Sequence, residues 1–294
     1  MEFIQSRSIL SKVSYGGQWF GIDYNMNLYR GCPHGCIYCD SRSECYGIEN
    51  YDQPRGKENA LLLLEQELQK KRKKGVVGLG SMSDTYNPLE KEYEQTRGAL
   101  MLLLKYGFGV AIDTKSDLIL RDIDLLKQIS ERNDAIVKIT VTTPHDELSE
   151  IIEPHVCVSS ERLAAIKELT DNGIFTGILM TPVLPFITDK EDDIRLLVRN
   201  AADHGTHFIY TFMSMTLRDR QRDYYFRKLD ESFPGLKEKY RRCYGNRYDC
   251  VVPDHEHLWK AFIEECERSG ILYKMEDIIK AYKRNRTTEQ YTLF

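Results

Sequence analysis

Between residues 58 and 212, short apolar runs alternate with longer segments whose apolar residues recur at helical spacing. Glu58–Lys73 carries apolar residues at positions 61, 64 and 68, which is the spacing of one buried helix face. Val76–Gly80 follows as a short apolar run bounded by glycines, which indicates a buried strand. The same order repeats towards residue 212, so the pattern predicts alternating strands and helices.

Six strands are expected, with helices between them. The expected strands are Ile22–Tyr29, Val76–Gly80, Gly109–Thr114, Ala135–Thr142, Ile174–Thr181 and His207–Phe212. The expected helices are Glu58–Lys73, Asn87–Tyr106, Leu118–Arg132, Ser159–Asn172 and Thr188–His204. Asn87-Pro88 is a helix start, Thr188 and Glu191 have the spacing of a capping box, and Gly173 is a helix stop.

Regular alternation of this kind implies right-handed crossovers and a parallel sheet. Six units form either an incomplete barrel or a doubly wound sheet, and in both architectures functional groups gather at the carboxyl ends of the strands. Polar segments stand at those ends, namely the cysteine-rich loop after Tyr29, Ser81–Asp84, Thr114–Ser116 and Thr142–Thr143. The sequence therefore predicts a functional site along this edge.

The pattern changes after Met215. Leu217–Tyr248 is rich in Arg, Lys, Tyr and Asp, and His257–Gly270 and Met275–Arg286 are predicted helices. We therefore expect an N-terminal segment (residues 1–19), an α/β core (20–215) and a helical C-terminal extension (216–294).

Composition narrows the class of protein. The 294 residues are 41% hydrophobic and 29% charged, with a net charge of −4, which excludes disordered and fibrous chains. The longest uncharged apolar run, Ala60–Leu64, is too short to cross a bilayer, and Met1–Lys12 lacks the pattern of a signal peptide. We expect a cytoplasmic protein without a membrane partner. Disulfides are rare in that compartment, so the eight cysteines favour metal or redox roles.

The segment Cys32-Pro-His-Gly-Cys36-Ile-Tyr-Cys39 concentrates three thiols in one loop. They can converge on a single centre only from a tight turn, which Gly31 and Gly35 permit. Thiolates select zinc, copper(I) or iron–sulfur clusters. Spacing leaves three sites open, which are a zinc site completed by His34 or Cys45, a closed cluster that uses Cys45, and a three-cysteine cluster with one open iron.

This cysteine motif, with Tyr38 before its last cysteine and a first strand ahead of it, resembles the radical S-adenosylmethionine (radical SAM) superfamily. The segment Asn27–Asp40 is similar to the branch related to spore photoproduct lyase. Ser81–Asp84, Thr114–Ser116, Glu153-Pro154 and Ser160–Leu163 match that branch in the same order. The resemblance covers roughly residues 20–215 and implies a partial (β/α)6 TIM barrel with a helical C-terminal extension.

The resemblance also implies the cofactors and the residues that hold them. Cys32, Cys36 and Cys39 would bind a [4Fe-4S] cluster, whose open iron would chelate S-adenosyl-L-methionine. Reductive cleavage of that cofactor would give a 5′-deoxyadenosyl radical that abstracts a substrate hydrogen, with a reducing partner such as flavodoxin or ferredoxin. The residues expected to bind the cofactor are Tyr38, Ser83, Lys115, Thr140 and Thr142. No residue is assigned to the chemistry on the substrate.

One departure from the lyase separates this chain from thymine-dimer repair. The lyase returns a hydrogen to its product through a cysteine two residues before the serine that matches Ser83, and that position is Ser81 here. The tyrosine after the last cluster cysteine is replaced by Asp40. Cys45, Tyr86 and Tyr210 are candidates for a different donor.

The remaining signals leave the substrate open. Cys243, Cys250 and Cys266 have spacings that match no tight cluster motif, so core packing and a second metal site with His255 or His257 both stay open. Arginines and tyrosines interleave in residues 218–248, which suits nucleic acid, although the net charge of −4 disfavours strong nonspecific binding. We therefore carry two hypotheses, a radical SAM enzyme with an unidentified substrate, and an iron–sulfur or zinc protein for electron transfer or sensing.

Overall fold

A computed structural model describes residues 2–14 and 17–283, and its centre is a single mixed sheet. The strands of this sheet are β2 (Leu10–Lys12), β3 (Tyr24–Met26), β6 (Val76–Leu79), β7 (Gly109–Thr114), β8 (Ala135–Thr140), β9 (Thr176–Leu179) and β10 (Phe208–Tyr210). Their order is β10-β9-β8-β7-β6-β3-β2, and every pair is parallel except β2 with β3. The six predicted strands are confirmed as the parallel part. Because β10 and β2 stand at opposite ends of this order, the sheet is the expected partial barrel.

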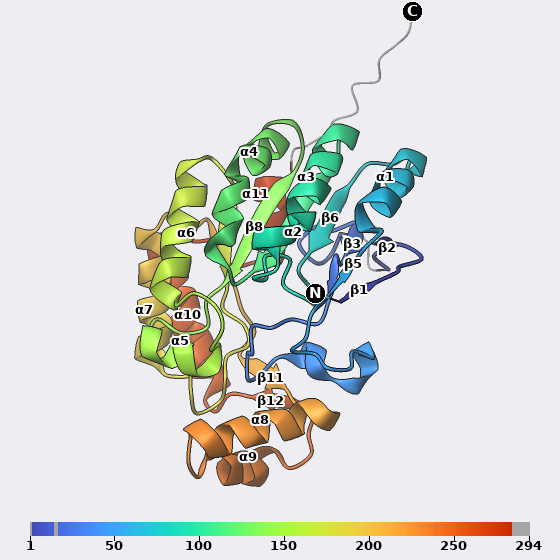
Figure 1. The fold of residues 1–294 in the computed structure, drawn as a ribbon. Coiled ribbons are helices and arrows are strands. Elements are labelled where there is room, and N and C mark those ends of the chain that lie inside the picture. Colours follow the sequence, from blue (N-terminus) through green and yellow to red (C-terminus); the bar gives the residue numbers. More distant parts are fainter. Residues whose placement is uncertain (1, 15–16, 284–294) are drawn as a thin grey trace, which may run out of the picture.

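Helices cover the outer face of the sheet (Figure 1). They are α1 (Ala60–Lys70), α3 (Gln95–Tyr106), α4 (Ile123–Arg132), α6 (Ser159–Asp171) and α7 (Glu191–Asp203). Side chains of β7 alternate between the two faces, so Val110 and Ile112 pack in the apolar core beneath these helices, whereas Ala111 belongs to a separate cluster on the inner face. The alternation leaves inward positions free to form a site.

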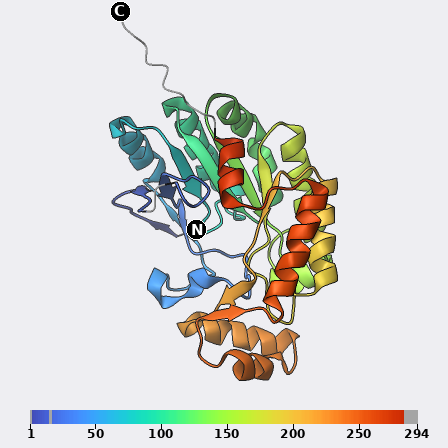
Figure 2. The same cartoon turned by 180° about the vertical axis from the view of Figure 1, so that it is seen from behind.

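The inner face has an apolar floor. Ala111 and Ile136 pack there with Phe20 and with Ile278 and Tyr282 of α11 (Met275–Tyr282). Figure 2 shows α11, in red, against the sheet on the side away from the outer helices. The floor closes one end of the barrel. The buried Lys138 ammonium lies 4.5 Å from the centre of the Phe20 ring of this floor and pairs with Asp113 at 2.8 Å.

Smaller elements lie around this frame. The strands β1 (Phe3–Ile4), β4 (Tyr29–Arg30) and β5 (Arg55–Lys57) form a second sheet, and β11 (Ser214–Thr216) pairs with β12 (Asp249–Val251). Short helices are η1 (Asp40–Arg42), η2 (Glu44–Tyr46), α2 (Glu90–Tyr93), η3 (Asp117–Asp122) and α5 (Asp146–Ile152). The C-terminal region adds α8 (Asp219–Ser232), α9 (Leu236–Tyr244) and α10 (His255–Ser269).

One predicted helix is interrupted, and another begins later than expected. The expected helix from Asn87 to Tyr106 is broken at Glu94, which has a φ of 46°, because the Glu90 carboxylate accepts a hydrogen bond from the Thr96 backbone N–H at 2.9 Å. The expected capping box at Thr188 is wrong. Its hydroxyl accepts a hydrogen bond from the Leu184 N–H at 2.8 Å, and α7 begins only at Glu191.

The C-terminal region is helical as expected, with one added strand pair. β11 lies across the predicted boundary at residue 215, and α10 packs on α7, where Arg195 forms an ion pair with Glu264 at 2.9 Å. Of the expected helix Met275–Arg286, residues 284–286 lie outside the described residues. Within the described part of the chain, no helix is both long enough and apolar enough to cross a membrane.

Candidate cluster and cofactor site

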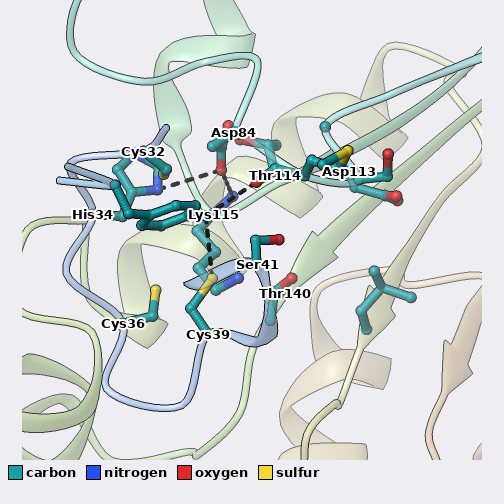
Figure 3. Close-up of a pocket in the computed structure, with 15 residues that line it drawn as sticks. Cys32, His34, Cys36, Cys39, Ser41, Asp84, Asp113, Thr114, Lys115 and Thr140 are labelled. Atoms are coloured by element: carbon teal, nitrogen blue, oxygen red, sulfur yellow. Dashed lines mark hydrogen bonds and ion pairs between the residues drawn. The ribbon is translucent and has the colours of Figure 1, made fainter. Parts of the chain in front are cut away.

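The cysteine loop leaves β4 and turns back over the open end of the barrel. Cys32, Cys36 and Cys39 all line one cavity of about 190 Å³, which Figure 3 shows from close by. Gly31 and Gly35 have φ values of 90° and 71°, a region that favours glycine. A Cβ on Gly31 would lie 2.7 Å from the Tyr51 carbonyl oxygen, so this turn requires glycine, as the sequence predicted.

Backbone hydrogen bonds fix the loop at both ends. The Cys32 N–H donates to the Tyr51 carbonyl at 2.8 Å, and the Ile37 N–H donates to the Ile152 carbonyl at 3.0 Å. Beyond the second anchor, the Cys39 sulfur lies 3.2 Å from the Tyr51 hydroxyl, which donates to the Met82 carbonyl at 3.0 Å. Tyr51 therefore links the loop to the segment after β6.

The three thiols fit a metal cluster by their chemistry. Burial and the nearby Asp84 carboxylate raise the pKa of Cys32 to about 12, and burial also raises the pKa of Cys36, against the nearby Lys115. Such thiols ionise only beside a strong positive charge, which bound iron provides. Cys45 is exposed and lies outside the cavity, so a closed cluster or a zinc site that uses Cys45 as its fourth ligand loses its support, whereas His34, the other candidate fourth ligand of a zinc site, lines the cavity.

Asp84 organises the wall opposite the cysteines. Its carboxylate accepts hydrogen bonds from the Thr114 hydroxyl at 2.7 Å and from the Lys115 N–H at 2.8 Å, and it lies 3.5 Å from His34 Nδ1. Asp84 thereby ties the loop after β6 to the end of β7. Burial alone would lower the pKa of Lys115, but Cys36, Glu153 and Asp84 hold it above its usual value, so this lysine is a cation at the cavity.

A second polar group lies behind the loop. The Tyr38 hydroxyl donates to Glu153, which also accepts from the Thr142 hydroxyl at 3.2 Å and pairs with Arg162. Arg162 further donates to the Thr140 carbonyl at 3.1 Å and, through Nε, to the Cys157 carbonyl at 2.7 Å. Both Glu153 and Arg162 have exposed fractions of 0%. This network holds the back of the cysteine loop against β8 and α6.

The structure brings only part of the predicted cofactor set to the cavity. Lys115 and Thr140 line it. Tyr38 and Thr142 lie behind it in the network with Glu153, although the Tyr38 ring is 5.8 Å from the Lys115 ammonium. Ser83 lines a neighbouring cavity, and Ser81 and Met82 face the cysteines instead.

Sequence reasoning did not assign roles to four residues of this region. Asp84 is the last residue of the matching segment Ser81–Asp84, where an acid ahead of a helix is typical of ordinary capping, and Glu153 and Arg162 belong to matching motifs without a role of their own. Their complete burial is visible only in the structure, and an acid and a base nine positions apart give no signal in the sequence alone. Tyr51 carries no sequence signal, because the return of the loop alone places it beside Cys39.

Other candidates fall outside this site. Cys250 and Cys266 are buried in different apolar clusters, and Cys243 is exposed. The Cys157 sulfur lies 3.1 Å from the Lys115 carbonyl.

The two tyrosines named as candidate hydrogen donors also lie elsewhere. Tyr86 is fully buried, and Tyr210 packs against Trp19 and Phe20, and neither lines the cysteine cavity. Within residues 2–14 and 17–283, no three His, Cys, Asp or Glu side chains are grouped to hold a single metal ion.

Comparison with known proteins decides the family. A model of the radical SAM superfamily matches residues 26–198, more than half of the chain. The chain belongs to the radical SAM superfamily. The match contains the cysteine loop, Asp84, Lys115 and the Glu153–Arg162 pair, so the whole site lies within the part that is typical of radical SAM proteins.

Relatives and solved structures agree with this membership. An uncharacterized protein of Methanocaldococcus jannaschii is 29% identical over 74% of this chain and 81% of its own length. A radical SAM Nα-GlyT isomerase of Pseudomonas phage M6 is 25% identical over 62% of this chain and 37% of its own length. A spore photoproduct lyase variant has a TM-score of 0.67 at 15% identity, over 92% of this chain and 80% of its own, which shows the shared fold.

Proposed function

We propose that Cys32, Cys36 and Cys39 hold a [4Fe-4S] cluster at which this radical SAM enzyme cleaves S-adenosyl-L-methionine. The observation that carries the proposal is the convergence of the three thiols on one cavity beside the Lys115 ammonium. When bound, the cluster supplies the electron that splits the cofactor and yields a 5′-deoxyadenosyl radical able to abstract a substrate hydrogen. Membership of the superfamily favours this enzyme over a protein for electron transfer or sensing alone.

The chain's own residues would bind and orient the cofactor. Lys115 offers a positive charge to the cofactor carboxylate, and the Thr140 hydroxyl lines the same cavity as a hydrogen-bonding group. Asp84 positions Lys115 through its backbone N–H. We assign Tyr38 and Thr142 to positioning, because their hydroxyls bond to Glu153 behind the loop. Ser83 is removed from the proposed cofactor set because it lines the neighbouring cavity.

For the substrate, we propose a chemical class and not a particular compound. Among similar proteins, one solved lyase is complexed with dinucleoside spore photoproduct, which supports a nucleic-acid component as a candidate substrate. The arginines of the C-terminal region add little to that support. Arg220 Nε donates to the Arg42 carbonyl at 2.6 Å, and Arg222 donates to the Gly245 carbonyl at 2.8 Å, so these guanidinium groups hold loops together. A low-potential reductant such as flavodoxin or ferredoxin is the proposed electron donor.

Anaerobic reconstitution with iron and sulfide tests the proposal. With dithionite and S-adenosyl-L-methionine, the wild-type protein should release 5′-deoxyadenosine, and Cys36→Ala should abolish both the cluster absorbance and this product. Cys45→Ala is the matched control, since this thiol is exposed and outside the cavity, and it should retain the cluster and the product. An intact cluster that yields no 5′-deoxyadenosine would contradict the proposal.

A further inference from the structure

A second cavity lies next to the cysteine cavity. Its volume is about 310 Å³, and Met82 lines both cavities, so the two are neighbours. The second cavity is formed where β4 and β5 meet the loop after β6, with Arg30 and Lys57 from the strands and Ser83 from the loop. It contains none of the residues assigned above to the cluster or to its cofactor.

The charge of this cavity is one-sided. Arg30 and Lys57 are the charged side chains among its lining residues, and neither forms an ion pair within the described residues. Two carboxylates nearby are engaged elsewhere. Glu67 accepts hydrogen bonds from the backbone N–H groups of residues 9 and 10, at 3.1 and 2.7 Å, and Glu58 accepts one from Gln5 at 2.6 Å. Two cations therefore face one cavity without an acid among its lining residues.

The charge of Arg30 is felt at Lys57. Burial and the Arg30 guanidinium lower the pKa of Lys57, and only Glu67 opposes them. Arg30 also donates a hydrogen bond to the Gly47 carbonyl at 2.5 Å, which holds its guanidinium in place. Like charges held close together are stabilised when an anion binds between them.

Two buried polar atoms at this cavity have no hydrogen-bond partner. Ser83, which is only 5% exposed, has an unpartnered hydroxyl, and Asn27 has an unpartnered Oδ1. Buried polar atoms of folded proteins are bonded in the great majority of cases. Both atoms have almost no accessible surface, so each side chain would have to rotate towards the cavity to reach a ligand. The hydroxyl could then donate to an anion, whereas the Asn27 carbonyl oxygen can only accept. A ligand that satisfies both atoms carries an anionic oxygen and also an N–H or O–H donor.

We propose that the cavity of Arg30, Lys57, Ser83 and Asn27 binds a phosphate ester that carries a neighbouring hydroxyl or N–H group. Arg30 and Lys57 would neutralise the phosphate, Ser83 would donate to one phosphate oxygen, and Asn27 would accept from the ester's donor. Free inorganic phosphate would leave Asn27 without a partner. That this ester is part of the substrate rests on the proposed function, because Met82 places the cavity beside the proposed cofactor site.

Protection of Lys57 from acetylation tests the proposal on the full-length protein. Lys57 is labelled with acetic anhydride and followed by peptide mass spectrometry, with the exposed Lys70 as internal reference. Thymidine 5′-monophosphate and ribose 5-phosphate represent two sources of the ester. At least one of them should slow Lys57 labelling about tenfold at roughly ten times its dissociation constant, without changing Lys70. The ester that protects at the lower concentration identifies the source.

Controls decide whether the site is specific. Sodium chloride at equal ionic strength should not protect Lys57, and inorganic phosphate should protect only at higher concentration than the better ester. Protection by chloride equal to that by the esters, or by inorganic phosphate equal to that by both, would overturn the proposal. So would labelling that neither ester slows. Labelling needs no reduced cluster, so lost 5′-deoxyadenosine formation with intact protection would contradict the proposed function alone.

Two arginine variants on the second sheet, formed by β1, β4 and β5, serve as test and control. Arg30→Gln should abolish most of the protection, while Arg55→Gln, on the same face of β5 as Lys57 but outside the cavity, should retain it. Ser83→Ala removes the unpartnered hydroxyl without a change of charge and should weaken protection severalfold. Equal protection in Arg30→Gln and Arg55→Gln would show that the cavity does not bind the ester.

Discussion

The two sides of the cysteine loop are both polar, but their polar groups are used differently. Behind the loop, Glu153 and Arg162 are fully buried and bond to Tyr38, Thr142 and backbone carbonyls. In front of the loop, the thiols and the Lys115 ammonium face an open cavity. Groups that satisfy one another stabilise a fold, whereas groups that face a cavity are available to a ligand. The difference therefore separates residues that hold the site from residues that are available to a ligand.

Among the residues behind the loop, the substitution Arg162→Met should have the largest effect on the free energy of unfolding. The substitution leaves Glu153 buried without its strongest partner, which should cost about 3–5 kcal/mol of unfolding free energy. Chemical denaturation of the protein without cluster measures this loss. The double variant Glu153→Gln with Arg162→Met should recover a large part of it. Equal loss in both variants would contradict the assignment of Glu153 as the cause.

The same pair predicts a pH dependence. Burial would raise the pKa of Glu153, but Arg162, Lys115 and the Tyr38 hydroxyl outweigh burial and hold it below its usual value. A lowered pKa in the folded state stabilises the protein above pH about 4.5, and the contribution is lost as the pH falls through the folded-state value. The double variant should lose less stability than the wild type as the pH falls below about 4.5. An identical acid profile for the two proteins would contradict this prediction.

The sequence predicts the fold more completely than it predicts the site. Alternating apolar segments predict the parallel strands. Because parallel strands all point the same way, their carboxyl ends share one edge of the sheet, and Lys115 and Thr140 are therefore predicted at that edge. Ser83 shows the limit. In the loop after β6 a shift of one residue moves a side chain from one cavity to the next, and Met82 takes the position at the cysteines. Loop conformation depends on tertiary contacts such as those of Tyr51 and Asp84, which no local spacing encodes.

In front of the loop, Lys115→Met should weaken cofactor binding with little effect on stability. Loss of one charged hydrogen-bond donor to the cofactor carboxylate corresponds to about 1.5–3 kcal/mol, or a roughly 10- to 100-fold rise in the KM for S-adenosyl-L-methionine. The KM is measured from 5′-deoxyadenosine formation, and cluster content by iron analysis should equal that of the wild type. A variant with normal KM would place Lys115 among the holding residues.

The smallest effect is expected at Tyr51, which lies on the border between the two sides. Tyr51→Phe removes a hydroxyl that lies 3.2 Å from the Cys39 sulfur and donates to the Met82 carbonyl at 3.0 Å. Each such hydrogen bond contributes about 1 kcal/mol, so unfolding free energy should fall by about that amount. A cluster-bound Cys39 sulfur carries no proton, so a hydrogen bond in this pair would have to come from the Tyr51 hydroxyl in place of its bond to the Met82 carbonyl. Since hydrogen bonds to cluster sulfurs raise the reduction potential, the variant's cluster should then have a lower midpoint potential in an anaerobic redox titration. A lower stability with an unchanged potential would assign Tyr51 to the structural side, and a lower potential with unchanged stability would assign it to the site.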